Sequence, residues 1–209
     1  MKKLLIIGAS GHGKVIANMA SDSKLWDEIS FLDDYKVGQE VLGFNVMDSS
    51  INAIQYIEEY DFIVGIGDAD IRAEITKRLK EIGATIATVV HPSAIVGLDV
   101  SIGQGTVVMP NCVINPSVYI GEGCIVNTGS SIDHDCEIAD FSHLSPGVVL
   151  GGTVNIGFKT WLGVGAKVIN NIEITNNCLI GAGAVVVNDI TCPGVYVGVP
   201  AKMVEEVRR

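Results

Sequence analysis

A six-residue repeat runs through the second half of the chain and constrains its fold more than any other feature. From Val96 to Val186, every sixth residue is isoleucine, leucine or valine, and the register never slips. These positions are Val96, Ile102, Val108, Ile114, Ile120, Val126, Ile132, Ile138, Leu144, Leu150, Ile156, Leu162, Val168, Ile174, Ile180 and Val186. A small or β-branched residue stands two places before each later aliphatic one. An unbroken six-residue period indicates a solenoid, because an amphipathic strand alternates every two residues and a helix every 3.6.

The repeat predicts a parallel β-helix of triangular section. Each hexapeptide forms one short flat face and one corner, so three hexapeptides make a coil. The aliphatic residue and the small residue both point inward, and glycine or asparagine supplies the corner dihedrals. Stacked at the interstrand spacing, the repeats make about five coils and roughly 25 Å of prism. A run of ordinary β-hairpins would need two-residue alternation and tight turns, which this sequence lacks.

Residues 1–92 predict a small α/β domain of the Rossmann-like kind, and residues 93–209 hold the β-helix and a short tail. Expected strands are Leu4–Ile7, Ile29–Leu32, Val41–Met47, Asp61–Ile66 and Ala84–Val90, and expected helices are Val15–Ala20, Ser50–Ile57, Ala69–Ile82 and, in the tail, Val204–Arg209. The α/β domain is about half the size of a full dinucleotide-binding domain. The missing second nucleotide half argues against a dehydrogenase.

A glycine-rich segment, Gly8-Ala9-Ser10-Gly11-His12-Gly13-Lys14, joins the first strand to the first helix. Strand, glycine-rich turn and helix form the arrangement that cradles phosphate on free N–H groups. The spacing is G-x-x-G-x-G, neither the dinucleotide fingerprint nor a P-loop, so a purely structural turn is the alternative. Asp33 and Asp34 end the second strand, where Rossmann-like folds hold a ribose hydroxyl. The two signals together favour a nucleotide over a structural turn and a solvated acidic loop.

Two of the four histidines, His134 and His143, fall within the repeat. The register places both of them, and Asp135, on the outside of the prism. An imidazole beside a carboxylate suits general-base catalysis, because the carboxylate fixes the tautomer and stabilises the cation formed on proton uptake. Acyl transfer to an amine needs such a base, and a backbone N–H would stabilise the oxyanion. Solvent-exposed surface histidines are the alternative interpretation.

Composition narrows the classes of partner. The formal charge is −10 and no basic run occurs, which argues against nucleic acid and anionic membranes. Cys112, Cys124, Cys136 and Cys178 fill the small inward position of the repeat and act as small hydrophobes rather than nucleophiles, whereas Cys192 lies outside the register and is unassigned. The apolar run at the N-terminus is too short for a signal peptide, and no stretch is long enough to span a membrane. We therefore expect a cytoplasmic protein.

Six segments, taken in order, resemble the NeuD/PglD-type sugar O-/N-acetyltransferase family of hexapeptide-repeat acyltransferases. They are Gly8-Ala9-Ser10-Gly11-His12-Gly13, Phe31-Leu32-Asp33-Asp34, Ile66-Gly67, Ile132-Asp133-His134-Asp135-Cys136, Phe141-Ser142-His143 and Gly198-Val199-Pro200-Ala201-Lys202. The resemblance implies a left-handed β-helix, a homotrimer with its active site between subunits, and acetyl-CoA as co-substrate. It also implies a nucleotide-linked amino sugar as acceptor.

The resemblance assigns roles position by position. His134 matches the catalytic base, and Asp135 matches the acidic residue that raises its basicity, where relatives carry glutamate. Ser10, Gly11, His12, Asp33, Asp34 and Gly67 match the sugar-nucleotide site, and His143, Val164 and Ala182 match the groove for acetyl-CoA. No metal ligand is implied.

Four functions remain open on the sequence. N-acetylation of a nucleotide-linked 4-amino-4,6-dideoxyhexose ranks first, because the glycine-rich loop and the paired aspartates favour a nucleotide-linked substrate. O-acetylation of a sugar such as a sialic acid is the second. A zinc carbonic anhydrase would need three histidine ligands, and the repeat contains only His134 and His143. A non-catalytic, nucleotide-sensing trimer is the fourth. The sequence does not identify the base of the nucleotide or the amino sugar.

Overall fold

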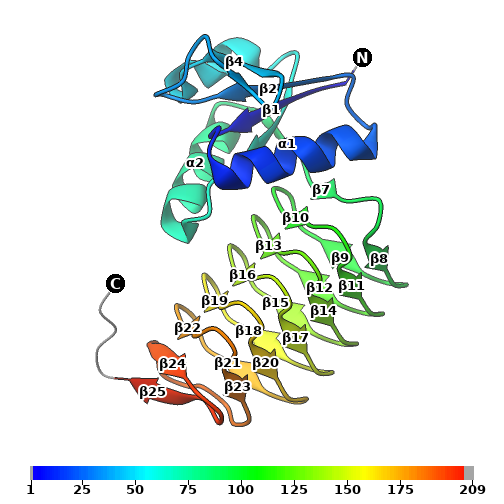
Figure 1. Cartoon of the computed structure of the whole chain (residues 1–209), viewed down its shortest axis with the longest axis vertical. Helices are drawn as coiled ribbons and strands as arrows, with labels where there is room; N and C mark the ends of the chain where they lie inside the picture. The colour runs from blue at the N-terminus through cyan, green and yellow to red at the C-terminus, as the bar shows by residue number, and fades with distance from the viewer. Residues whose placement is uncertain (1, 205–209) are drawn as a thin grey trace. The chain divides into compact units, whose positions relative to one another are not determined.

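The structure, a computed structural model, describes residues 2–204 of the chain (Figure 1). It divides into two compact units, and the boundary falls between Pro92 and Ser93. Within residues 2–204, no helix has the length and apolar character needed to cross a membrane.

The first unit is built on a six-stranded sheet in the order β3-β4-β2-β1-β5-β6. Its strands are β1 (Lys3–Ile7), β2 (Glu28–Leu32), β3 (Glu40–Val41), β4 (Phe44–Asp48), β5 (Asp61–Val64) and β6 (Thr85–Ile86). The helices are α1 (Gly11–Ser23), the 3-10 helix η1 (Ser50–Tyr56) and α2 (Ala69–Glu81). Central β1 pairs in parallel with β2 and β5, as expected for a nucleotide-binding α/β domain.

Three predicted elements of this unit differ from those observed. The single strand expected at Val41–Met47 is a hairpin, since Leu42 and Gly43 both adopt positive φ angles (54° and 80°) and form a two-residue turn between β3 and β4. The helix expected from Val15 already begins at Gly11, directly after the glycine-rich turn. The last predicted strand is split into β6 and β7 (Val89–Val90).

The two faces of the sheet are covered differently. Leu5, Ile7, Phe62 and Val64 pack with Ala53 of η1 and Leu79 of α2 in one apolar cluster, together with Leu32, Tyr60, Ala84 and Ile86. Helix α1 lies on the opposite face, where a Cβ on Gly13 would lie 1.9 Å from the carbonyl oxygen of Gly8. Gly13 is therefore needed for helix packing.

The second unit is a parallel β-helix with three walls, each made of two-residue strands. Wall 1 consists of β10 (Val107–Val108), β13 (Ile125–Val126), β16 (His143–Leu144), β19 (Trp161–Leu162) and β22 (Leu179–Ile180). Wall 2 consists of β8 (Ile95–Val96), β11 (Val113–Ile114), β14 (Ser131–Ile132), β17 (Val149–Leu150), β20 (Lys167–Val168) and β23 (Val185–Val186). Wall 3 consists of β9 (Ser101–Ile102), β12 (Tyr119–Ile120), β15 (Glu137–Ile138), β18 (Asn155–Ile156) and β21 (Glu173–Ile174). Figure 1 shows the stacked coils.

Residues eighteen positions apart stack on one another, as three hexapeptides per coil require. Ile125 pairs with His143, and Trp161 pairs with Leu179. The aliphatic residues of the repeat are buried from Val108 onward, whereas Val96 in the first coil is exposed. The predicted prism is thus confirmed.

The small inward positions close the corners from inside. Cys112, Cys124, Cys136 and Cys178 are all buried, and burial raises the pKa of Cys112, Cys136 and Cys178. Polar residues at the same position bond to the backbone: the hydroxyl of Thr106 donates to the carbonyl oxygen of Gly121 at 2.7 Å. The four buried thiols therefore act as small hydrophobic side chains and not as nucleophiles, as predicted. Cys192, by contrast, is exposed.

The prism is followed by the antiparallel hairpin of β24 (Val195–Val197) and β25 (Lys202–Val204). Strand β24 pairs in parallel with β22 and so extends wall 1. Of the helix predicted at Val204–Arg209, Val204 instead ends β25, and residues 205–209 lie outside the described part of the chain.

Candidate functional site

His134 lies on the corner between walls 2 and 3, two residues after the buried Ile132. Its side chain is 57% exposed, and its Nδ1 lies 2.7 Å from Oδ2 of Asp135. Asp135 adopts a left-handed backbone conformation (φ 56°) at the turn. With Nδ1–H donating to Asp135, the lone pair on Nε2 is left to accept a proton. The arrangement is that of a general base with a carboxylate partner.

Two further residues support this pair electrostatically. The hydrogen bond to Asp135 raises the pKa of His134, and the charge of Asp133 raises this pKa further. Oδ1 of Asp133 accepts hydrogen bonds from the Asn115 side chain and the His134 backbone N–H, both at 2.8 Å. The bond from Asn115 lowers the pKa of Asp133 and so keeps its carboxylate charged. The sequence analysis missed Asn115, although it lies eighteen residues before Asp133 and therefore one coil away.

The imidazole of His134 rests against the next coil at Gly152. A Cβ on Gly152 would lie 2.7 Å from both Cε1 and Nε2 of the ring. The backbone beside it is fixed, because the N–H of Thr153 donates to the His134 carbonyl oxygen at 2.9 Å. Gly152 therefore provides the space for the ring. In the sequence, the glycine pair Gly151-Gly152 lies one coil beyond His134, and this pair is the signal that could have indicated space for the ring.

His143 lies on wall 1, where its ring stacks on the indole of Trp161 with centroids 5.6 Å apart and planes 3° from parallel. Nε2 of His143 lies 3.3 Å from Nδ2 of Asn127. The indole N–H of Trp161 donates to the Ser145 hydroxyl at 2.8 Å. The outer side of wall 1 therefore carries an ordered aromatic stack, and Trp161 is a member that the sequence analysis missed.

Val164 and Ala182, predicted to line the same groove as His143, lie on the corner between walls 1 and 2. Both are exposed, and the N–H of Gly183 donates to the Val164 carbonyl oxygen at 2.8 Å, which places the two residues in successive coils. His143, Trp161, Val164 and Ala182 thus form a strip along wall 1 and its edge, which we call the wall 1 strip.

The His134 corner lies opposite His143 and Trp161 of wall 1, whereas Val164 and Ala182 lie at a different corner, where walls 1 and 2 join. His134 stands where walls 2 and 3 join, and in a triangular section this corner is opposite wall 1. The space between is filled by buried side chains such as Ile132, Leu144 and Cys136. A single chain therefore does not bring His134 to the wall 1 strip.

The predicted nucleotide site of the first unit is held together at the peptide of Ala9. The Ala9 N–H donates to Oδ2 of Asp33 at 2.8 Å, and Nζ of Lys36 donates to the Ala9 carbonyl oxygen at 2.6 Å. Ser10 caps α1 without a side-chain cap bond, and no atom lies within 4 Å of a Cβ built on Gly11. Asp33 and Lys36 therefore fix the Ala9 peptide, and the space beside Gly11 is open. The sequence analysis missed Lys36.

Asp34 is tied to the start of η1, although the residue is exposed. Its Oδ1 accepts hydrogen bonds from the Ser49 hydroxyl at 2.6 Å and the Ser50 N–H at 2.8 Å. The bond from Ser49 is the largest of the causes that lower the pKa of Asp34. Asp33 and Asp34 therefore both keep a defined orientation beside the glycine-rich loop.

His12 differs from His134 in its burial, in the charges around it and in the direction of its pKa shift. Burial, and then the charge of Arg72, lowers its pKa to about 4. Its Nε2 is buried and has no hydrogen-bond partner among the described residues. Arg72 is itself buried and donates from Nη1 to the carbonyl oxygens of Ile66 at 3.0 Å and Gly67 at 2.7 Å. Arg72 thus lies near the neutral imidazole of His12 and also holds the carbonyl oxygen of Gly67.

The sequence analysis did not predict that Arg72 is buried. In the structure Ile71 is 48% exposed, whereas Arg72, Thr76 and Leu79 are buried. Asp68 caps the helix by accepting from the N–H groups of Asp70 and Ile71. Among residues 2–204, no cluster of three or more His, Cys, Asp or Glu side chains is placed to hold a metal ion.

Comparisons with known proteins match both units. The model of the PglD N-terminal domain matches residues 3–79, and the model of the bacterial transferase hexapeptide (six repeats) matches residues 99–134. UDP-N-acetylbacillosamine N-acetyltransferase of Bacillus subtilis is 33% identical over 113 residues. That match covers 50% of this chain and 50% of the relative, so the aligned region spans about half of the curated protein.

Solved structures match over nearly the whole chain. The acetyltransferase domain of PglB from Neisseria gonorrhoeae has a TM-score of 0.94 at 37% identity, covering 98% of this chain and 100% of that one. The same domain in complex with acetyl coenzyme A has a TM-score of 0.94 at 38% identity, covering 97% and 99%. A mutant of perosamine N-acetyltransferase from Caulobacter crescentus, in complex with CoA and GDP-perosamine, has a TM-score of 0.91 at 32% identity, covering 99% and 98%. The fold class, a Rossmann-like α/β domain followed by a left-handed β-helix, is confirmed.

Proposed function

Because the chain belongs to the PglD/NeuD-type family of hexapeptide-repeat sugar acetyltransferases, we propose that it acetylates the 4-amino group of a nucleotide-linked 4-amino-4,6-dideoxyhexose. Acetyl-CoA is the acetyl donor, and the product serves surface-glycan biosynthesis. The observation that carries the proposal is the pair of His134 and Asp135, exposed on a corner of the prism with 2.7 Å between Nδ1 and Oδ2.

His134 acts as the general base in this reaction. Nε2 accepts a proton from the sugar amine as the amine nitrogen attacks the thioester carbonyl, and Asp135 stabilises the imidazolium through Nδ1–H. A C–N bond forms, the C–S bond breaks, and the proton passes to the departing thiolate of CoA. The attack is direct: the four cysteines of the repeat are buried, and exposed Cys192 is not among the residues assigned to the site, so no covalent acyl-enzyme is invoked.

We propose that the complete site forms between copies of the chain in a homotrimer. The His134 corner of one copy faces the wall 1 strip of its neighbour, so that His143, Val164 and Ala182 line the acetyl-CoA groove. The separation of these groups on one prism supports this arrangement, since the filled interior lies between His134 and His143, and Val164 and Ala182 lie at another corner. The stack of His143 on Trp161 gives the groove a flat aromatic surface.

The sugar nucleotide binds at the glycine-rich loop of the first unit. The N–H groups at the start of α1 hold the phosphates around Ser10, Gly11 and His12, and no acidic residue in the first turn of α1 opposes them. Asp33 and Asp34 accept from ribose hydroxyls. Gly67 lies where a Cβ would meet no atom within 4 Å, which leaves room for the ligand.

A thiol-release assay tests the proposal. Acetyl-CoA is offered with UDP-, dTDP- and GDP-linked 4-amino sugars and with free sialic acid. We expect CoA release with at least one amino-sugar nucleotide, and a loss of about 10² to 10⁴-fold in kcat for His134→Ala. The matched control is Asn155→Ala, at an outward position of wall 3. Release only with sialic acid would favour O-acetylation, and undiminished activity in His134→Ala would exclude this residue as the base.

A further inference from the structure

Trp161 stands on the outer side of wall 1 and is held at two points. Its indole stacks face to face on the imidazole of His143, with ring centroids 5.6 Å apart and planes 3° from parallel. Its N–H donates to the hydroxyl of Ser145 at 2.8 Å. The residue is nevertheless 48% exposed, so it does not serve to fill the interior of the prism. Exposure together with a fixed orientation suits a residue that serves a site on the surface.

Ser145 is a rigid anchor for the indole. It is 3% exposed, and its backbone is bonded on both sides. Its N–H donates to the carbonyl oxygen of Leu162 at 2.9 Å, and its carbonyl oxygen accepts from the Ser130 hydroxyl at 3.2 Å. His143 and Trp161 are paired in neighbouring strands of wall 1, which sets their rings one above the other. The coil therefore fixes the plane of the indole, and the indole in turn fixes the plane of the imidazole.

The Nε2 edge of His143 faces Asn127 of the preceding coil. Oδ1 of Asn127 accepts a hydrogen bond from the Thr128 N–H at 2.8 Å, so the amide group turns its Nδ2 toward the imidazole. This Nδ2 lies 3.3 Å from Nε2 of His143. Because an amide nitrogen only donates, Nε2 is the acceptor, and the proton of the neutral ring is on Nδ1.

We propose that Trp161 is a positioning residue for acetyl transfer: anchored on Ser145, it holds His143 in one ring plane and so preserves the Nδ1–H tautomer that Asn127 selects. The inference rests on the proposed function, in which His143 lines the acetyl-CoA groove, and adds a residue that acts through His143. The terminal torsion of a histidine side chain has broad minima, so without the stack the imidazole is free to turn. Nε2 then leaves the Asn127 amide, and either ring nitrogen carries the proton.

Substitutions separate the stack from the hydrogen bond. Trp161→Phe keeps a flat ring over the imidazole and loses the N–H that reaches Ser145, whereas Trp161→Leu loses the stack as well. Tyr119→Leu is the matched control, because Tyr119 is 50% exposed and occupies the same outward position in a two-residue strand of wall 3. A general effect of removing a surface aromatic ring from the prism would appear in both leucine variants.

Two measurements on the full-length protein test the inference. The first needs no substrate: the nitrogen NMR shifts of the neutral His143 ring report which nitrogen carries the proton. We expect Nδ1–H in the wild type, in Trp161→Phe and in Tyr119→Leu, and a mixture of tautomers in Trp161→Leu. The second is steady-state acetyl transfer, followed by thiol release. We expect Trp161→Leu to raise the KM for acetyl-CoA about tenfold, and Trp161→Phe to raise it by no more than about threefold. The KM for the sugar nucleotide stays unchanged in both, and Tyr119→Leu changes neither KM.

Each contrary result has its own meaning. Nδ1–H alone in Trp161→Leu would overturn the inference, since Asn127 would then hold the tautomer without the stack. An unchanged KM for acetyl-CoA in Trp161→Leu would overturn it too, as would an equal rise in Tyr119→Leu or a rise of both KM values. If the wild-type protein released no thiol with any acceptor, the proposed function would fail, and the tautomer in Trp161→Leu would still decide whether Trp161 orients His143.

Discussion

His134 and His12 carry the same side chain in opposite surroundings. His134 is exposed, touches Asp135 and lies near the charge of Asp133, and its pKa is raised. His12 has a buried Nε2 and a nearby guanidinium, and its pKa is lowered to about 4. The first is built to take up a proton, and the second is built to stay neutral. Under the proposed function, the contrast assigns proton transfer to His134, whereas His12 stays neutral beside the glycine-rich loop.

The largest expected effect comes from removing the charge that makes His134 basic. Asp135→Asn keeps the size of the side chain but loses the carboxylate that fixes the tautomer and stabilises the imidazolium. We expect kcat to fall about 100-fold. We also expect the acidic limb of the pH–kcat profile to move to lower pH, because the pKa of His134 falls when its main cause is removed. Steady-state kinetics between pH 5 and 9 measure both quantities.

Asp135→Glu is the control for this prediction, since it restores the carboxylate on a longer side chain. We expect it to recover most of the activity and the acidic limb of the pH profile. If Asp135→Asn and Asp135→Glu behave alike, the carboxylate does not raise the basicity of His134. The contrast with His12 would then say nothing about catalysis.

The next effect concerns His12 and the stability of the first unit. Its pKa is lowered to about 4 in the folded protein, against 6.5 as the ordinary value, so the unfolded chain takes up a proton first as the pH falls. The stability that depends on neutral His12 is complete above pH 6.5 and is lost between pH 6.5 and 4. At ~1.4 kcal/mol per pKa unit, the loss is about 3 kcal/mol.

His12→Gln is expected to remove this part of the acid sensitivity, because glutamine does not titrate. Hydrogen exchange of peptides from residues 3–32, measured at pH 7 and pH 4.5, reports the first unit alone. Asn18→Ala, an exposed position on the same helix, is the control and retains the wild-type pH dependence. An identical loss of protection in His12→Gln would mean that the imidazole is already charged in the folded state.

How far the sequence alone predicts each site depends on what fixes its position. The six-residue register fixes which side chains leave the prism, and His134, Asp135 and His143 lie outside as the register requires. The contact between His134 and Gly152 depends on a side-chain rotamer across two coils, and no periodicity encodes a rotamer.

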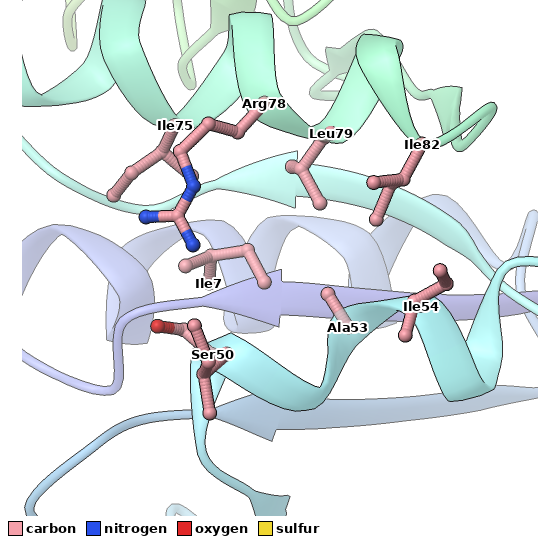
Figure 2. A pocket seen from close by; sticks show the side chains of 9 residues that line it. Ile7, Ser50, Ala53, Ile54, Ile75, Arg78, Leu79 and Ile82 are labelled. Carbon is pink, nitrogen blue, oxygen red and sulfur yellow. The ribbon is translucent and has the colours of Figure 1, made fainter.

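In the first unit the order of elements is readable, because buried strands and a glycine-rich turn leave strong signals. The burial of Arg72 is not readable, because arginine in a helix is usually a surface residue, and its hydrogen bonds to the carbonyl oxygens of Ile66 and Gly67 exist only in the folded protein. The hollow between η1 and α2, lined by Ile54 and Ile82 among others (Figure 2), is equally hidden, since it depends on where two short segments meet in space. The sequence therefore predicts the order of strands and helices better than the cavities and side-chain contacts that form between them.

A smaller effect is expected from crowding the base rather than changing its charge. Gly152→Ala adds a Cβ that would lie 2.7 Å from the ring of His134, which must swing away from its position. We expect kcat/KM to fall about tenfold, in line with the cost of misplacing a catalytic group, with little change in thermal stability because the imidazole is at the surface. In a double-variant cycle with His134→Ala, Gly152→Ala is expected to cause no further loss. An additive loss would show that Gly152 acts on the coil and not on the histidine.

The smallest effect tests the more distant charge. Asp133 raises the pKa of His134 without a hydrogen bond to its ring, and it is the second cause after Asp135. In Asp133→Asn we expect an NMR titration of His134 to show a lower pKa than in the wild type, with a smaller drop than in Asp135→Asn. Raising the salt concentration screens interactions between exposed charges, so it reduces the difference between Asp133→Asn and the wild type while affecting the directly bonded Asp135 less. If the two aspartates contributed equally at all salt concentrations, the basicity of His134 would come from the overall acidity of the corner, and the short contact with Asp135 would not be what separates this histidine from His12.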